Sequence, residues 1–220
     1  GHADKIKLKT LEKIKFDFPN IKISQWFLDP LTKNGPDYNK NKKRLLDKFP
    51  ILDTTFVTTH PDAIDFIKNK DKIFFIPNPV DQSIDNLNIS RNETHKFDVF
   101  FALSHGVHRG ILKKGKLDNR TKILDLIYNN KKIKTNFFGY KNKQPIWSNS
   151  FLTELSKCKL GLNLSRGKPV KYYSSDRIAQ FMGNGLPTLI DHNTKYKDFF
   201  TNNEAIFYKN NNELIKKILF

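Results

Sequence analysis

The sequence predicts an α/β protein built of two doubly wound parallel-sheet domains. Two observations support this. Short β-branched and aromatic runs alternate with amphipathic stretches along all 220 residues, a pattern typical of parallel sheets with crossover helices. The run 97–103 (FDVFFAL) is apolar almost throughout, as expected of a strand covered on both faces. Between the halves lies a polar stretch without apolar periodicity, so we expect a first domain at 1–82, a linker at 83–96 and a second domain at 97–220.

In the first half, a helix over 5–15 would place Leu8, Leu11 and Ile14 on one face. The runs that follow alternate between the two kinds of element. We expect strands at 21–29, 51–58 and 73–77 and helices at 38–49 and 62–69. Trp26 is assigned to the core of this half.

The second half continues the alternation with a longer set of elements. The expected strands are 97–103, 133–138, 160–164, 188–190 and 205–208. The expected helices are 120–128, 151–157, a short one after residue 174, 195–200 and a last one from 212. Trp147 is also assigned to the core.

The stretch Val170–Asp191 predicts a loop, a short helix, a glycine turn and a buried strand. Ser174 and Ser175 are suited to cap the helix, and Gly183 and Gly185 to end it. A helix start presents free backbone N–H groups and a positive dipole end. We therefore expect a seat for an anionic, ring-bearing ligand such as a nucleotide diphosphate.

Composition limits the classes of protein to which this chain can belong. The net charge of +17 comes mostly from lysines spread with Asn, Ile and Phe along the chain, which favours compositional bias over a nucleic-acid-binding surface. No apolar run is long enough to span a membrane. The single cysteine, Cys158, fits a reducing compartment and a structural role. We expect a cytoplasmic chain, with association at a membrane surface left open, and a fragment, since the first residues lack Met and the last lie in a predicted helix.

In open parallel sheets, ligands bind outside the carboxyl ends of the strands. In the second half these ends are 104–110, 139–143, 165–167 and 170–177. Arg109, Arg166 and Arg177 all fall there, although lysine is the ordinary base of this chain. The planar guanidinium is suited to bidentate phosphate contact. The alternative is that these glycines and arginines serve only turns and surface.

Histidines and one aspartate are candidates for proton transfer. His105 could face a donor phosphate or an acceptor hydroxyl, or could simply bond backbone. Asp29 and His60 end strands of the first half, and either could be a general base or a turn residue. No grouping of His, Cys, Asp and Glu has metal-ligand spacing, so no metal is expected.

Roughly residues 97–219 resemble GT-B glycosyltransferases of the group-1-like family that includes the spore-maturation CgeB-type proteins. The resemblance is carried by FDVFFALSHGVHRG, FFGY, CKLGLNLSRG, DRIAQFMGNGLPTLID, YKDFF, EAIFY and NNELIKKI, in that order. It implies two Rossmann-like domains, the first incomplete by one or two β-α units, with IPNPVD resembling its last strand.

The resemblance also implies an activity: metal-independent, hexosyltransferase-like transfer of a sugar from a nucleotide-sugar donor to a glycan, lipid-linked or cell-surface precursor acceptor, with no cofactor. The catalytic candidates are His105, Asp29 and His60. The donor-binding candidates are Gly106, His108, Arg109, Ser165, Arg166, Tyr172, Tyr173, Ser174, Ser175, Asp176, Arg177 and Gln180.

Two positions depart from the family pattern. Gln180 stands where many relatives carry the Glu that holds the donor ribose, and Tyr172 stands where retaining enzymes have another Glu. A glutamine can still donate and accept hydrogen bonds. A non-catalytic nucleotide-sugar or polyanion-binding protein is therefore the first alternative, and a nucleic-acid binder a weaker one.

Overall fold

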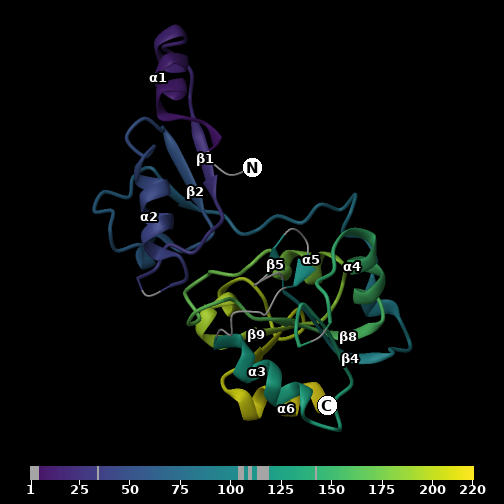
Figure 1. Cartoon of the computed structure of the whole chain (residues 1–220). Coiled ribbons are helices and arrows are strands. Elements are labelled where there is room, and N and C mark those ends of the chain that lie inside the picture. Colours follow the sequence, from purple (N-terminus) through teal and green to yellow (C-terminus); the bar gives the residue numbers. More distant parts are fainter. Residues whose placement is uncertain (1–4, 34, 104–106, 109–110, 113–118, 142) are drawn as a thin grey trace. The chain divides into compact units, whose positions relative to one another are not determined.

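A computed structural model gives the fold of the chain (Figure 1). It describes residues 5–33, 35–103, 107–108, 111–112, 119–141 and 143–220. The chain is α/β and divides into two compact units. The first unit holds Gly1–Asn78 and Val170–Tyr173, and the second holds Pro79–Pro169 and Ser174–Phe220. Each unit carries a parallel sheet flanked by helices, as expected of Rossmann-like domains.

The first unit has a three-stranded sheet in the order β1-β2-β3, fewer strands than a complete doubly wound domain has. Its strands are β1 (Ser24–Phe27), β2 (Thr54–Val57) and β3 (Ile73–Phe75), and its helices are α1 (Leu8–Asp17) and α2 (Tyr38–Leu46). Alternate residues of a strand point to opposite faces. Phe27, Val57 and Ile73 accordingly lie in one core with Leu45 of α2.

The opposite face of this sheet carries a row of aromatic rings. Trp26, Phe56 and Phe74 are neighbours in register across the strands. Trp26 is 41% exposed and Phe74 is 50% exposed. The assignment of Trp26 to the core was therefore wrong, because its partner in the core is the next residue, Phe27, on the other face.

The second unit has a five-stranded sheet in the order β10-β9-β8-β4-β7. Its strands are β4 (Phe97–Ala102), β7 (Thr135–Phe138), β8 (Cys158–Asn163), β9 (Thr188–Asp191) and β10 (Ile206–Tyr208). Its helices are α3 (Asn119–Tyr128), α4 (Ser148–Leu155), α5 (Arg177–Gly183) and α6 (Asn211–Leu219). Helices α3 and α6 cover one face, and α4 and α5 cover the other (Figure 1).

The chain places β7 on one side of β4 and then β8, β9 and β10 on the other side. The direction of the strand order thus changes between β4 and β8. Such a switch point leaves a crevice at the carboxyl ends of the two strands. The predicted parallel sheet is confirmed, and its topology marks where a ligand site belongs.

The stretch 83–96, expected to link two domains, packs on the second unit. Ile89 is fully buried in the core beside Phe181. Asn184, also fully buried, donates to Asp85 Oδ1 at 2.8 Å and accepts from the Leu87 amide at 3.2 Å. The turn that ends α5 is therefore also the docking point for this stretch.

Glycines make that docking close. A Cβ on Gly183 would lie 2.6 Å from the Val80 side chain. A Cβ on Gly185, whose φ is +71°, would lie 3.2 Å from the Ile89 amide nitrogen. The turn that the sequence indicated as a helix stop thus also admits a neighbouring segment.

Two expected helices are absent from the described residues. The stretch 62–69 contains only the end of a short 3₁₀ turn, η2 (Pro61–Ala63), and 195–200 contains only η5 (Tyr196–Asp198). Helix nucleation costs free energy that only a longer run of helical hydrogen bonds offsets, and both runs are too short for that. A short antiparallel pair, β5 (Val107–His108) and β6 (Ile111–Leu112), lies where a loop was expected.

Candidate functional site

Arg177 lies at the switch point of the second sheet. It is the first residue of α5. Its Nη1 donates to the Ala102 carbonyl at the end of β4 at 3.3 Å, and its Nη2 donates to the Leu164 carbonyl just after β8. Its guanidinium also lies 4.9 Å from the Phe101 ring centroid. One cation thereby joins the ends of the two strands between which the strand order reverses.

Beside Arg177 is a pocket of about 310 Å³, which we call the switch-point pocket. The end of β4 contributes Ala102 and Leu103, the stretch before it Ile84 and Asp85, and α5 contributes Arg177 and Gln180. The whole lining is Ile84, Asp85, Ala102, Leu103, Ile146, Trp147, Ser148, Asn149, Phe151, Leu152, Asp176, Arg177 and Gln180. All of it belongs to the second unit.

Trp147 gives this pocket an aromatic ring. It is the residue before α4 and is 49% exposed, so its assignment to the core was wrong. The buried aromatic of this helix is Phe151, one turn later, which packs edge-on against Phe100. An exposed tryptophan in a pocket that an arginine also lines offers a surface on which a planar ring can stack.

The two serines predicted to cap α5 do something else. The N-cap residue is Asp176, and it makes no side-chain capping bond. Ser174 is buried, and its hydroxyl bonds Asn163 Oδ1 at 3.0 Å. The Ser175 amide donates to the Ser165 hydroxyl at 3.3 Å. These contacts fix the loop before α5 to the end of β8, because polar groups buried there need partners.

The loop 165–167 is held from a second side by Asn119, which sequence reasoning missed. The Asn119 amide nitrogen donates to the Gly167 carbonyl at 2.6 Å, and its oxygen accepts from the Gly167 amide at 2.8 Å. Arg166 lies half-buried between these anchors. A lone asparagine at a helix start gives no sequence signal for a partner 48 positions away.

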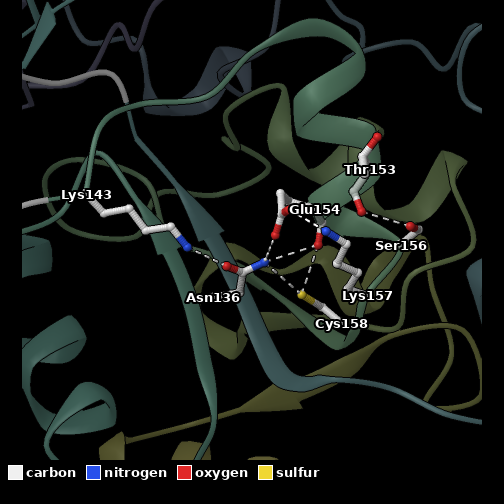
Figure 2. Close-up of polar contacts among 7 residues, drawn as sticks. All are labelled: Asn136, Lys143, Thr153, Glu154, Ser156, Lys157 and Cys158. Carbon is white, nitrogen blue, oxygen red and sulfur yellow. Dashed lines mark hydrogen bonds and ion pairs between the residues drawn. The ribbon is translucent and has the colours of Figure 1, made fainter.

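A polar cluster around the buried Asn136 fixes the rim at the end of β7 (Figure 2). Asn136 is fully buried and donates to Glu154 Oε2 at 3.0 Å. Lys143 Nζ donates to Asn136 Oδ1 at 2.8 Å, and burial lowers the pKa of Lys143. Lys157 donates to Glu154 and holds the pKa of that carboxyl below its usual range. The cluster thus anchors the end of the 139–143 loop to α4.

Cys158 belongs to the same cluster. Its thiol bonds the Glu154 carbonyl at 3.3 Å (Figure 2). Burial raises its pKa to about 12, so the thiolate that nucleophilic chemistry needs is absent at neutral pH. This agrees with the structural role expected from the sequence.

Several predicted site residues lie outside the described residues or outside the second unit. His105, Gly106 and Arg109 fall in the ranges that the structure does not describe. His108 is placed only through its backbone, in β5. Tyr172 and Tyr173 belong to the first unit, whereas Ser174, Ser175, Asp176, Arg177 and Gln180 belong to the second.

In the first unit, Asp29 is already paired. Arg44 Nη1 donates to Asp29 Oδ2 at 2.6 Å, and the Arg44 guanidinium lies 5.3 Å from the Phe27 ring centroid. This ion pair ties the Asp29 carboxylate to α2. The contact gives Asp29 a structural partner, while its role as a general base stays a prediction.

His60 and Tyr172 are brought together by the structure. Their rings meet edge-on at 4.8 Å, and Phe75 lies 5.2 Å from Tyr172. His60 Nδ1 accepts from the Asp62 amide at 3.2 Å, which leaves the ring proton on Nε2 in the neutral form. Tyr172 has a left-handed backbone, φ +57°, a conformation that costs energy for a side chain of this size.

The pKa of His60 is lowered from its ordinary value of 6.5, chiefly by burial and then by Lys171. A group whose folded pKa is depressed binds more protons in the unfolded chain, so stability falls as pH drops below 6.5. We expect urea midpoints to decline between pH 7.5 and 5, and His60→Gln to flatten that slope. The same slope in the wild type and His60→Gln would contradict this account.

Comparison with known proteins bears on the second unit. Residues 120–220 match a family model described as glycosyl transferase-like. The match supports a glycosyltransferase-like family and, in general, glycosyl transfer between a sugar donor and an acceptor. It begins at α3 and includes Trp147, Arg177 and Gln180 but not β4. No curated protein sequence matches the chain.

The fold of the chain is similar to a solved structure from Candida albicans described as a trehalose-6-phosphate phosphatase N-terminal domain. The two share 13% identity with a TM-score of 0.51, over 96% of this chain and 60% of that one. The present chain therefore spans about three fifths of that structure. At this identity the likeness shows an α/β fold alone, and the activity in that description is not carried over.

Within the described ranges, no group of three or more His, Cys, Asp and Glu side chains is placed to hold a metal ion. No helix among the described residues combines the length and apolar character needed to cross a membrane.

Proposed function

We propose that the chain is a glycosyltransferase of GT-B architecture whose second unit binds a nucleotide-sugar donor in the switch-point pocket. The observation that carries this proposal is the position of the pocket. It lies where the strand order reverses, beside Arg177, and partly within the residues that match the glycosyl transferase-like family model. Ligands of open α/β sheets bind at that position.

The lining supplies what a nucleotide needs. Trp147 offers a ring face for the base. Gln180 lines the same pocket from α5, and its amide can bond both hydroxyls of a ribose. Arg177 adds a positive charge at the strand ends. A volume of about 310 Å³ lies at the lower end of the range for small-molecule sites, so we assign the pocket to the nucleoside part of the donor.

Sugar transfer builds negative charge on the leaving nucleotide diphosphate. A fixed cation at that position lowers the barrier, because the charge is greater in the transition state than in the bound donor. Arg177 is fixed by the two carbonyls that it bonds. In this proposal it replaces the metal ion that other designs use. The donor sugar goes to a glycan or lipid-linked acceptor, and Asp29, His60 and His105 are the candidate proton acceptors.

The test is nucleotide binding by the full chain and by tryptophan variants. We expect UDP or GDP to bind wild type and Trp147→Ala to weaken binding about tenfold or more, since base–aromatic stacking contributes about 1–3 kcal/mol. Trp26→Ala is the matched control, because Trp26 is similarly exposed but lies on the first sheet. Isothermal titration measures the nucleotide affinity of wild type and of each variant. Repeating the titration with a chelator tests whether binding needs a metal ion. Equal losses in the two variants, or no binding by wild type, would refute the pocket assignment.

The alternative of a non-catalytic nucleotide-sugar-binding protein shares this pocket. It is favoured by Gln180, which lacks the carboxylate of the family pattern. Donor hydrolysis or transfer measured by nucleotide release separates the two, since a binding protein saturates with nucleotide yet releases none from its sugar conjugate.

A further inference from the structure

Helix α1 of the first unit begins without a capping side chain and without an acidic residue in its first turn. Lys7 is the N-cap residue and makes no side-chain capping bond, and the first turn holds no acidic residue. The first backbone N–H groups of a helix have no partner within it, and the dipole makes that end positive. A lysine at this position adds positive charge where an anion is preferred.

Lys48, just after α2, provides an independent observation. Only 8% of this residue is exposed. Its Nζ is buried and has no hydrogen-bond partner among the described residues. A buried ammonium without a counter-charge is costly, by several kcal/mol in proteins. Among the described residues, then, the Lys48 ammonium has no hydrogen-bond partner, and an anion beside it would be stabilised.

These two features meet at one cavity, which we call the α1–α2 pocket. It has a volume of about 350 Å³ and is lined by Ile6, Lys7, Leu8, Arg44, Asp47 and Lys48. Asp29 already compensates Arg44 through the 2.6 Å contact. Lys7 and Asp47 are both exposed, so solvent weakens both charges, and their opposite signs offset each other. The electrostatic potential in the pocket is therefore set by Lys48 and the start of α1.

We infer that the α1–α2 pocket binds the phosphate group of an organic phosphate. Backbone N–H groups at a helix start together with an ammonium form a site suited to a tetrahedral oxyanion. The cavity is larger than one phosphate, and the neighbouring Ile6 and Leu8 are 50% and 38% exposed. The rest of the ligand is accordingly apolar in part. A soluble phosphate ester and a phospholipid headgroup share this chemistry.

The experiment compares wild type with Lys48→Met at constant ionic strength. The soluble arms are isothermal titrations with inorganic phosphate and with glycerol 3-phosphate. The lipid arm is co-sedimentation with phosphatidylglycerol vesicles, against phosphatidylcholine vesicles as blank. Lys43→Met is the matched control, because Lys43 is exposed on α2, close in sequence to Lys48, and does not line the pocket.

Loss of a charge-assisted contact should weaken binding roughly 10- to 100-fold in Lys48→Met, with Lys43→Met unchanged. Whichever arm shows this difference identifies the source of the phosphate. Without phosphate, Lys48→Met should be at least as stable as wild type, because it removes an uncompensated buried charge. In wild type, phosphate should also shift the amide NMR signals of Leu8 and Lys9, a readout that needs no variant.

Two results would overturn the inference. The first is that wild type binds neither the soluble phosphates nor the phosphatidylglycerol vesicles. The second is that Lys48→Met binds them as tightly as wild type, which would place the phosphate elsewhere, for instance at the switch-point pocket. Both are independent of the proposed transferase activity, because the α1–α2 pocket is formed by residues of the first unit alone.

Discussion

Gly139→Ala should destabilise the second unit by more than about 3 kcal/mol, among the larger effects of single substitutions. Gly139 follows β7 with φ +68°, and an added Cβ would overlap the Leu103 carbonyl oxygen and lie 2.9 Å from its carbonyl carbon. Both neighbours are backbone, so no side chain can rotate away. The end of β4 or of β7 must move, and Leu103 lines the switch-point pocket.

Gly185→Ala is the control for this prediction. Its φ of +71° is nearly the same, yet the closest atom to an added Cβ is the Ile89 nitrogen at 3.2 Å. Alanine in this conformation costs about 1 kcal/mol from the backbone alone. The difference between the free energies of unfolding of the two variants, measured in urea, therefore gives the cost of the overlap with Leu103. Nucleotide affinity should fall in Gly139→Ala only. Equal destabilisation of both variants would show that β4 and β7 separate at little cost.

The second large effect is expected at Asn184. Its amide nitrogen donates to Asp85 Oδ1 at 2.8 Å and to the Gln180 carbonyl at 2.7 Å, and its oxygen accepts from Leu87. Asn184→Ala removes all three bonds in a fully buried position. We expect a loss of about 2–4 kcal/mol, because each unsatisfied buried group costs about 1–3 kcal/mol.

Asn184→Asp should be worse than Asn184→Ala. A carboxylate cannot donate to Asp85 or to the Gln180 carbonyl, and it places a second negative charge beside Asp85. Asn212→Ala is the matched control, since Asn212 is exposed in α6 and alanine is the better helix former. Denaturant unfolding gives the order of stability. An Asn184→Asp variant as stable as wild type would contradict these hydrogen bonds.

Much of the fold could be predicted because the apolar pattern carries it. The runs that became β4, β8 and β9 were predicted as strands and are buried nearly throughout. For β4, the nearly continuous apolar run also predicted a strand covered on both faces. Trp26 and Trp147 show the limit of the same logic. Composition marks a tryptophan as apolar, but the face on which it lies depends on strand register or helix phase, and in both cases a neighbouring phenylalanine occupies the core.

The candidate site was predicted in part. The sequence singled out Arg177 and Gln180, and both line the switch-point pocket. It did not indicate that Arg177 bonds the ends of two strands, nor that Asp85 belongs to the same lining. These contacts join segments that are far apart in the sequence and meet only in the fold. Hydrophobic periodicity reports local structure alone, so it cannot predict them. His105 and Arg109 remain predictions, because they lie outside the described residues.

The contact between Asp85 and Asn184 also constrains when the second unit can form during synthesis. The two residues are 99 positions apart. Closing so long a loop costs entropy that only late contacts repay, and such topologies fold slowly. On the ribosome, Ile89 and its neighbours emerge long before the turn at 183–185 that receives them. Until that turn is made, an apolar segment and the end of the interior strand β4 stay exposed. During this interval the chain is most open to aggregation and to chaperones.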